Sequence, residues 1–216
     1  SRYRVNSPLR LRHALATMCA ETGLALSWES GAYDADGIVR NFGWNSELGT
    51  WRHSAHVTRA EAERIAALPV NADGSGPRCE ALFERIYGTG NPKKAKELGN
   101  TQPGDGWKFR GLGLPQATGR EAHETAARII GCSLTDLQLP LNSIHMFLIE
   151  WDEKNCNRYA DANDAVSVRK LINAGNLKVS IKRINGLPEA MAALRRAEAV
   201  ITDTDFSDDN TPVADL

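Results

Sequence analysis

Two glutamates near the start of the chain, Glu21 and Glu29, have the residue type and spacing for acid–base chemistry on a glycosidic bond. Glu21 falls in the last turn of an apolar segment with helical spacing, where the partial negative charge of a helix end disfavours a carboxylate. Its neighbours Met18, Cys19 and Leu24 limit hydration, and both effects favour the protonated form that a general acid needs. Position alone still favours a solvated helix glutamate without a catalytic role.

Glu29 follows a glycine, Gly23, at which the chain can reverse after the helix. The returning segment could bring Glu29 back toward Glu21. Glycoside hydrolysis uses two such carboxyl groups, about 5–5.5 Å apart for retention of configuration and about 6.5–9.5 Å apart for inversion. The sequence does not fix this distance, and Glu29 taken alone would be interpreted as an ordinary loop acid.

Residues 88–117 form the least regular part of the sequence and contain seven glycines. Aromatic and leucine residues, Trp107 among them, lie between these glycines. A long glycine-rich loop inside a compact domain usually has a functional role, so we expect one here. Residues 118–121, Thr-Gly-Arg-Glu, have the pattern of a capping box and predict that a helix begins with Thr118 as its N-cap.

The remaining elements that must position these side chains are predicted to be mainly helices. Apolar residues recur at helical spacing in several segments, and capping residues or glycines bound most of them. The helices are expected at residues 8–22, 58–68, 82–87, 118–131, 144–151, 168–175 and 187–201. Residues 24–50 are expected to be loop with short helical turns, and weak strand signals occur at 107–115 and 177–181. The predicted fold class is mostly α with a small β-hairpin element.

The bulk composition sets limits on the class of protein. The chain has 216 residues, enough for one domain, and its net charge of −1 argues against binding to nucleic acid through bulk charge. No apolar run is long enough for membrane insertion, and no signal peptide is visible. Because the chain begins at Ser1, we expect it to be processed, tagged or cut from a longer product. Residues 1–202 form the expected domain, and 203–216 an acidic, flexible tail.

No cofactor or metal site is predicted. The four cysteines contain no CxxC pair, and His53 and His56 are not part of an HExxH motif. Residues 111–113, Gly-Leu-Gly, lack the third glycine and the βαβ unit of a dinucleotide-binding loop. Acid–base hydrolysis needs only water, so its two glutamates would suffice.

Motifs in the same order resemble the catalytic core of glycoside hydrolase family 19, and most closely its phage and bacterial endolysin branch. The resemblance extends over residues 5–200 and is most specific in the block 99–120. The motifs that carry it are Ala20-Glu21-Thr22-Gly23, Glu29-Ser30 with Tyr33, Tyr87-Gly88, Gly99-Asn100, Pro103-Gly104-Asp105-Gly106-Trp107-Lys108-Phe109-Arg110-Gly111, Gly113-Leu114 and Gln116-Ala117-Thr118-Gly119-Arg120. Near the end, Ile172-Asn173-Ala174-Gly175 and Ile184-Asn185-Gly186 are alternative matches to one further motif.

The resemblance implies a two-lobed, lysozyme-like helical fold with a central cleft for polymers of N-acetylhexosamines. It implies an inverting mechanism in which Glu21 resembles the general acid and Glu29 the general base. The other residues implied are Thr118, which helps to hold the attacking water, and the substrate-binding residues Gln116, Tyr33, Trp107, Arg110 and Asn173. Structural roles stay open for four of these residues: Thr118 and Asn173 as helix caps, Gln116 as a loop tie, and Tyr33 as part of the core.

The expected function is that of an endo-acting, muramidase-like glycosidase that cleaves β-1,4 bonds of peptidoglycan in the cell wall, in the periplasm or outside the cell. We expect it to act as a monomer. Departures from the family motifs, such as Ala20 in place of the usual histidine and Leu112 in place of an arginine, motivate a glycan-binding domain without activity as an alternative. The sequence is also compatible with a chitinase and with an unrelated helical interaction domain.

Overall fold

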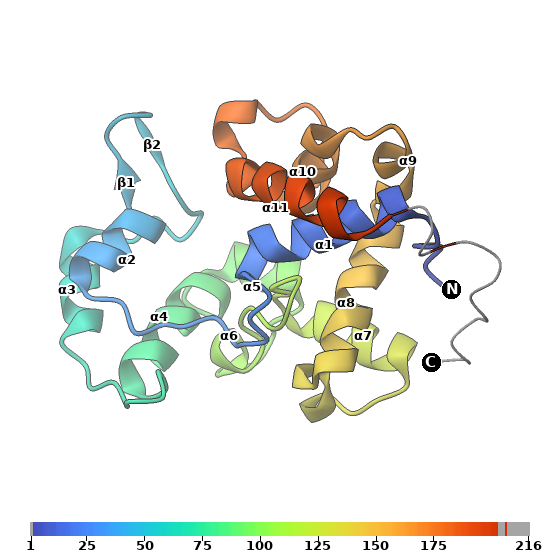
Figure 1. The fold of residues 1–216 in the computed structure, drawn as a ribbon. Coiled ribbons are helices and arrows are strands. Elements are labelled where there is room, and N and C mark those ends of the chain that lie inside the picture. The colour runs from blue at the N-terminus through green and yellow to red at the C-terminus, as the bar shows by residue number, and fades with distance from the viewer. Residues whose placement is uncertain (1, 203–205, 207–216) are drawn as a thin grey trace. The chain divides into compact units, whose positions relative to one another are not determined.

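Eleven α-helices and one two-stranded antiparallel sheet account for the regular structure of the described residues (Figure 1), which confirms the mostly α fold class with a small hairpin. The structure is a computed structural model that describes residues 2–202 and 206. The tail expected at 203–216 lies outside the described residues, apart from residue 206. The chain divides into two compact units, one of residues up to Leu26 and from Pro140 onward, the other Ser27–Leu139.

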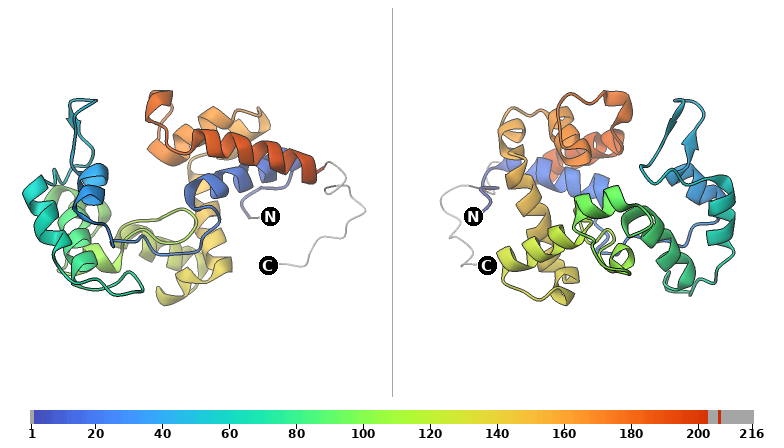
Figure 2. Two further views of the ribbon diagram at one scale, coloured as in Figure 1. Left: turned by 60° about the vertical axis from the view of Figure 1, so that its left-hand side comes forward. Right: turned by 180° about the vertical axis from the view of Figure 1, so that it is seen from behind.

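The first unit consists of helices from both ends of the chain. Its elements are α1 (Pro8–Thr22), α8 (Pro140–Glu153), α9 (Cys156–Asp161), α10 (Ala165–Ala174), a 3₁₀ turn η2 (Ile181–Arg183) and α11 (Leu187–Val200). Helices α1 and α11 lie side by side (Figures 1 and 2). Small buried residues form this contact, with Ala16 of α1 against Ala193 and Leu194 of α11. Short side chains allow close approach of the two helices.

Helix α1 begins and ends where the sequence predicts. The hydroxyl of Ser7 accepts a backbone N–H of the first turn, and Pro8 occupies the start of the helix. Gly23 closes the helix with a left-handed backbone (φ 61°) and donates its N–H to the carbonyl of Cys19 at 2.9 Å. Glu21 is therefore fixed in the last turn, as predicted.

The second unit is built around helix α4. Its elements are α2 (Ala35–Phe42), β1 (Trp44–Asn45), β2 (Thr50–Trp51), α3 (Arg59–Ala66), α4 (Pro77–Tyr87), α5 (Pro92–Leu98), α6 (Asp105–Lys108), α7 (Arg120–Ile130) and a 3₁₀ turn η1 (Thr135–Gln138). Leu82, Phe83 and Ile86 of α4 have no exposed surface and pack against Ile38 and Phe42 of α2. Burial of such side chains contributes about 1.5–3 kcal/mol each, so α4 is the main support for the loops around it.

The hairpin lies elsewhere than predicted. Strands β1 and β2 pair Trp44 with Trp51 and Asn45 with Thr50, within the segment that the sequence suggested was loop with short turns. At the predicted place, 107–115, α6 occupies the start of the segment, and the only pairing within the loop after it is an isolated antiparallel bridge of Leu112 with Ala117, whose two backbone hydrogen bonds are both 3.1 Å. No strand forms at 177–181, where described residues lead into the turn η2.

The predicted capping box at Thr118 is also wrong. The N-cap of α7 is Gly119, and the Thr118 hydroxyl donates instead to the carbonyl of Gln116 at 3.1 Å. The backbone N–H of Arg120 lies at the start of α7, where the helix itself offers no acceptor. It donates instead to the side-chain oxygen of Asn100 at 2.9 Å. A residue twenty positions earlier therefore supplies the acceptor expected from Thr118, and the Thr118 hydroxyl faces a loop carbonyl.

Glu84 of α4 holds the glycine-rich loop in place. Its Oε1 accepts from the N–H and the hydroxyl of Thr89, at 3.0 and 2.9 Å. Its Oε2 accepts from the N–H groups of Gly104 and Gly106, both at 3.2 Å. Hydrogen bonds to a charged acceptor are worth more than neutral ones. One carboxylate thus fixes both ends of the segment between α4 and α6, a role that the sequence did not reveal.

We expect Glu84→Gln to lower the free energy of unfolding by about 1–3 kcal/mol, because a carboxamide has one acceptor oxygen and leaves loop N–H groups without a partner. Chemical denaturation measures the loss, and hydrogen exchange should show faster exchange of the Gly104 and Gly106 amides. The matched control is Glu80→Gln, an exposed position one turn earlier on α4. Equal stability of the two variants would contradict this role.

Candidate active site

The carboxylate of Glu29 is held from two sides within the second unit. Its Oε1 accepts the hydroxyl hydrogen of Tyr87 at 3.2 Å, and its Oε2 accepts the N–H of Gly111 at 3.3 Å. The backbone N–H of Glu29 donates in return to the Gly111 carbonyl at 2.7 Å. A Cβ atom at Gly111 would lie 3.0 Å from Glu29 Oε2 and 2.9 Å from Gln116 Oε1. A side chain at Gly111 would therefore displace the Glu29 carboxylate or the Gln116 amide.

Burial raises the pKa of Glu29 above its ordinary value, against the lowering effects of the Gly111 N–H, the Tyr87 hydroxyl and the positive charge of Arg110. Burial also lowers the pKa of Arg110 to about 10. The pKa of Tyr87 is raised by burial and by the Glu29 charge, so its phenol stays a hydrogen-bond donor. A poorly hydrated carboxylate with a raised pKa is a stronger proton acceptor than a solvated one.

Arg110 and Trp107, two predicted binding residues, lie together beside Glu29. The Arg110 guanidinium is 3.4 Å from the centre of the Trp107 ring and 4.6 Å from that of Trp28. It donates to the carbonyls of Glu29 at 3.2 Å and Trp107 at 2.9 Å. The cation therefore sits between two indole rings and holds Glu29 from its backbone side. The sequence motifs did not reveal Trp28, although it directly precedes Glu29.

Tyr33 and Gln116 both lie near Glu29 and both have structural contacts. Tyr33 is half-buried, packs edge-on against Phe42 at 6.1 Å, and has a pKa raised by burial and by the charge of Glu29. The Gln116 amide nitrogen donates to the carbonyls of Ser27 at 3.2 Å and Gly113 at 2.9 Å. The second unit thus gathers five of the predicted site residues around one acid, and those residues are Glu29, Tyr33, Trp107, Arg110 and Gln116.

Glu21 lies in the first unit and forms an ion pair with Arg169 of α10. Arg169 has 1% of its surface exposed, and its second terminal nitrogen donates to the Asn185 carbonyl at 2.5 Å. The N–H of Asn185 donates to the side-chain oxygen of Asn173 at 3.2 Å. The structure thus places a buried cation against Glu21, whereas the sequence indicated only apolar neighbours that limit its hydration. The difference arises because the partner is 148 positions away in the chain.

Residues 172–175 and 184–186, the two alternative matches to the late motif, belong to one network. Asn173 comes from the first match, and Asn185 and Gly186 come from the second. Gly186 has a left-handed backbone (φ 69°), and a Cβ there would lie 3.0 Å from the Arg169 guanidinium and 3.1 Å from the Ala20 carbonyl. Both matches therefore support the residue that pairs with Glu21.

Glu150 of α8 is a further acid close to this network. Burial raises the pKa of Glu150, Lys154 lowers it through a 2.5 Å ion pair, and the charge of Glu21 raises it again. The sequence motifs revealed neither Glu150 nor Arg169. Helical periodicity could have placed them on inner faces, where a charged residue calls for a partner. Glu21 and Glu29 belong to different units, so their opposition across a cleft stays a prediction.

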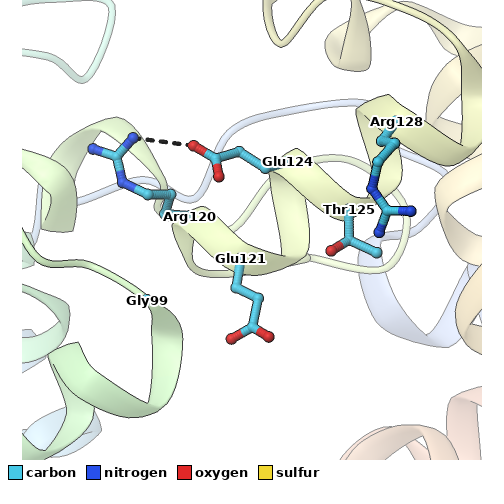
Figure 3. A pocket seen from close by; sticks show the side chains of 6 residues that line it. All are labelled: Gly99, Arg120, Glu121, Glu124, Thr125 and Arg128. Carbon is cyan, nitrogen blue, oxygen red and sulfur yellow. Dashed lines mark hydrogen bonds and ion pairs between the residues drawn. The ribbon is translucent and has the colours of Figure 1, made fainter.

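A separate open groove of about 470 Å³ lies along α7 (Figure 3). Its lining residues are Gly99, Arg120, Glu121, Glu124, Thr125 and Arg128. Arg120 and Glu124 pair across one turn at 3.1 Å, so part of its charge is already neutralised. The groove includes none of the predicted site residues and lacks a buried acid, so it is a weaker candidate than the Glu29 surroundings.

Neither a metal cluster nor a membrane-spanning helix occurs in the part of the chain that the structure describes. No three His, Cys, Asp or Glu side chains come together there in an arrangement that could hold a metal ion. None of the described helices combines the length and apolar character needed to cross a membrane.

Comparison with known proteins points to one family. No family model matches the sequence. A glycosyl hydrolase family 19 domain-containing protein from Haemophilus influenzae is 28% identical over 142 residues, which cover 63% of this chain. The match spans 61% of the relative's own length. This similarity supports a relationship at the level of glycosyl hydrolase family 19, while the endolysin branch stays a prediction.

We expect Arg169→Leu to lower the free energy of unfolding by about 3–5 kcal/mol, because it leaves Glu21 without its cation and the Asn185 carbonyl without its donor. The double variant Arg169→Leu/Glu21→Leu should recover part of this loss, since it leaves no unpaired charge. Urea denaturation of the three proteins measures both effects. The control is Arg195→Leu on α11, an exposed arginine. A single variant as stable as this control would exclude a structural role for the ion pair.

Proposed function

We propose that this chain is a glycosidase of the family 19 type that cleaves β-1,4 bonds in peptidoglycan by an inverting mechanism, acting as an endo-hydrolase and a monomer on the cell wall, in the periplasm or outside the cell. The observation that carries the proposal is the Glu29 carboxylate, which is largely buried and oriented by Tyr87 and Gly111 beside the Arg110–Trp107 pair. The family of the Haemophilus influenzae relative supports the same class of reaction.

In the proposed reaction Glu29 acts as general base. Its carboxylate takes a proton from a water molecule, whose oxygen attacks the anomeric carbon from the face opposite the leaving group. Tyr87 and Gly111 hold the carboxylate oxygens, which limits rotation of the base. The Thr118 hydroxyl donates to the Gln116 carbonyl, and its oxygen remains an acceptor for a hydrogen of that water. Trp107 and Arg110 would bind the sugar chain beside it.

Glu21 acts as general acid in this proposal. It gives its proton to the glycosidic oxygen as the bond to the anomeric carbon breaks, and the leaving sugar departs with a new hydroxyl group. Arg169 then stabilises the carboxylate that remains. Asn173, which holds the Asn185 loop in the structure, would bind sugar through its remaining hydrogen-bonding groups.

Peptidoglycan is proposed over chitin because the free carboxylates of its peptides make it anionic, whereas chitin is neutral. Exposed lysines on α5, Lys93 and Lys96, and the exposed Lys108 next to Trp107 supply complementary charge. Mass spectrometry of fragments released from purified peptidoglycan and from chitin tests this choice. Fragments from chitin alone would assign a chitinase.

A glycan-binding domain without activity is the second candidate, and a specific contact favours it. The residue that must donate a proton, Glu21, forms an ion pair with the buried Arg169. This candidate retains the aromatic and cationic residues around Glu29 and loses the acid function. It predicts retention on cell walls without release of reducing ends.

We expect Glu21→Gln and Glu29→Gln each to reduce release of reducing ends from peptidoglycan by at least about 10²-fold, because each removes one proton-transfer group. Binding to the same walls should survive in both variants, because the amide has nearly the shape of the acid. The matched control is Glu47→Gln, at an exposed position in the β1–β2 loop. If the parent protein binds walls and releases nothing, the second candidate is correct.

The pH profile should respond to Tyr87→Phe. A base must be ionised to work, so activity is lost as the pH falls through the raised pKa of Glu29. The Tyr87 hydrogen bond lowers that pKa, so its removal raises the pKa further and moves the acidic limb of the kcat/KM profile to higher pH. Tyr159→Phe, on α9 in the other unit, is the control and should leave the limb in place. A shift toward lower pH would contradict this assignment.

A further inference from the structure

The β1–β2 hairpin carries aromatic rings that the site does not use. We define the aromatic platform as the rings of Trp44, Trp51 and His56. Trp51 and His56 are stacked, with ring centres 4.9 Å apart and planes at 18°. Trp44 meets Trp51 edge-on at 5.5 Å, and 49% of its surface is exposed. Large aromatic side chains normally gain stability from burial, so exposed rings in a fixed arrangement indicate a binding role.

Hydrogen bonds within and next to the hairpin hold the platform in place. The side-chain oxygen of Asn45, which is 4% exposed, accepts from the N–H groups of Glu47 and Leu48 at 3.1 and 3.3 Å. The N–H of Arg52 donates to the Gly43 carbonyl at 2.9 Å and extends the pairing toward α2. Figure 2 shows the hairpin projecting from the end of α2 in both views. Rings held in place before binding lose little entropy when a ligand arrives.

Ring contacts also link the base of the hairpin to Glu29. Phe42, at the end of α2, meets His53 edge-on at 5.7 Å, and His53 meets Tyr87 edge-on at 5.8 Å. Tyr87 donates its hydroxyl hydrogen to Glu29. Burial lowers the pKa of His53 to about 4, and its Nδ1 accepts the Ala55 N–H at 3.1 Å, so the imidazole is neutral in this chain of rings. The platform thus belongs to the same unit and the same packed layer as the candidate base.

We propose that the aromatic platform binds a strand of the N-acetylhexosamine polymer through stacking of sugar rings on Trp44 and Trp51. A β-1,4-linked pyranose has a flat face of C–H groups that packs on an indole, while its hydroxyl and acetamido groups remain hydrated at the edge. The inference rests on the proposed function for the identity of the polymer. It adds a second contact for the glycan, one that is separate from the residues around Glu29.

The size of the platform argues against a protein partner. A stable interface between proteins buries about 1,200–2,000 Å². An indole contributes about 150–250 Å² when fully buried, and Trp44 has about half of its surface covered already. Two such rings fall well short of a dimer interface even when both copies are counted. They match one or two sugar rings, which need only a flat aromatic face and a polar surround.

Binding is measured with the full chain in the Glu29→Gln background, by calorimetry with a β-1,4 N-acetylglucosamine hexamer and by sedimentation with purified peptidoglycan. Trp44→Ala and Trp51→Ala should each weaken binding by about tenfold. Trp44→Phe and Trp51→Phe retain a ring and should retain most of the affinity. Leu48→Ala is the matched control, since this hairpin leucine is 62% exposed and has no ring.

The parent chain is assayed in parallel for release of reducing ends, which separates the two proposals. Weaker binding in the alanine variants, with the phenylalanine variants and Leu48→Ala unaffected, supports the platform. An active parent whose alanine variants bind as tightly overturns the platform and leaves the proposed function intact. A parent that neither binds nor cleaves overturns both. Unchanged glycan affinity with altered self-association would assign the rings to a second copy of the chain and overturn the inference.

Discussion

The backbone of the glycine-rich loop must be fixed by side chains from its neighbours, because glycines supply none of their own. Glu84 accepts N–H groups at both ends of the first half of the loop. Asn100 caps α7 at Arg120, and Arg120 pairs with the buried Asp105 at 2.5 Å. These contacts hold the loop on either side of Gly111. The N–H of Gly111 donates to the Glu29 carboxylate, and the N–H of Glu29 donates to the Gly111 carbonyl. The position of the candidate base thus depends on polar contacts that lie outside it.

The two glutamates have opposite surroundings. Glu29 is partly buried among rings and backbone, and desolvation is the largest influence on its pKa. Glu21 has a full positive charge against it, supplied by Arg169, which is itself buried. Environments that separate the properties of two carboxyl groups are the usual basis for dividing acid and base roles. In this chain the proposed acid, Glu21, is the residue with a cationic partner, and the proposed base, Glu29, is the one affected most by desolvation. The opposite arrangement would be expected for an acid and a base.

Local patterns in the sequence predicted local structure well. The helices expected from 58 and up to 87 and 175 form, because Thr58 and Glu61 make a capping box and Gly88 and Gly175 end their helices. The errors arise where a distant residue decides the outcome. Thr118 matches a capping pattern, but Asn100 supplies the acceptor. The same limit hid Arg169 and Glu84, because their importance lies in contacts with backbone or acids far along the chain, which periodicity does not record.

The surroundings of the proposed acid, Glu21, depend on one cation, Arg169. Arg169 has two acceptors, the Glu21 carboxylate and the Asn185 carbonyl. The Glu21 carboxylate and the Asn185 carbonyl thus share one buried guanidinium, so each acceptor helps to fix the cation that the other contacts. The loop of Asn185, fixed by Asn173 and by the close contact at Gly186, therefore fixes the cation that faces the proposed acid.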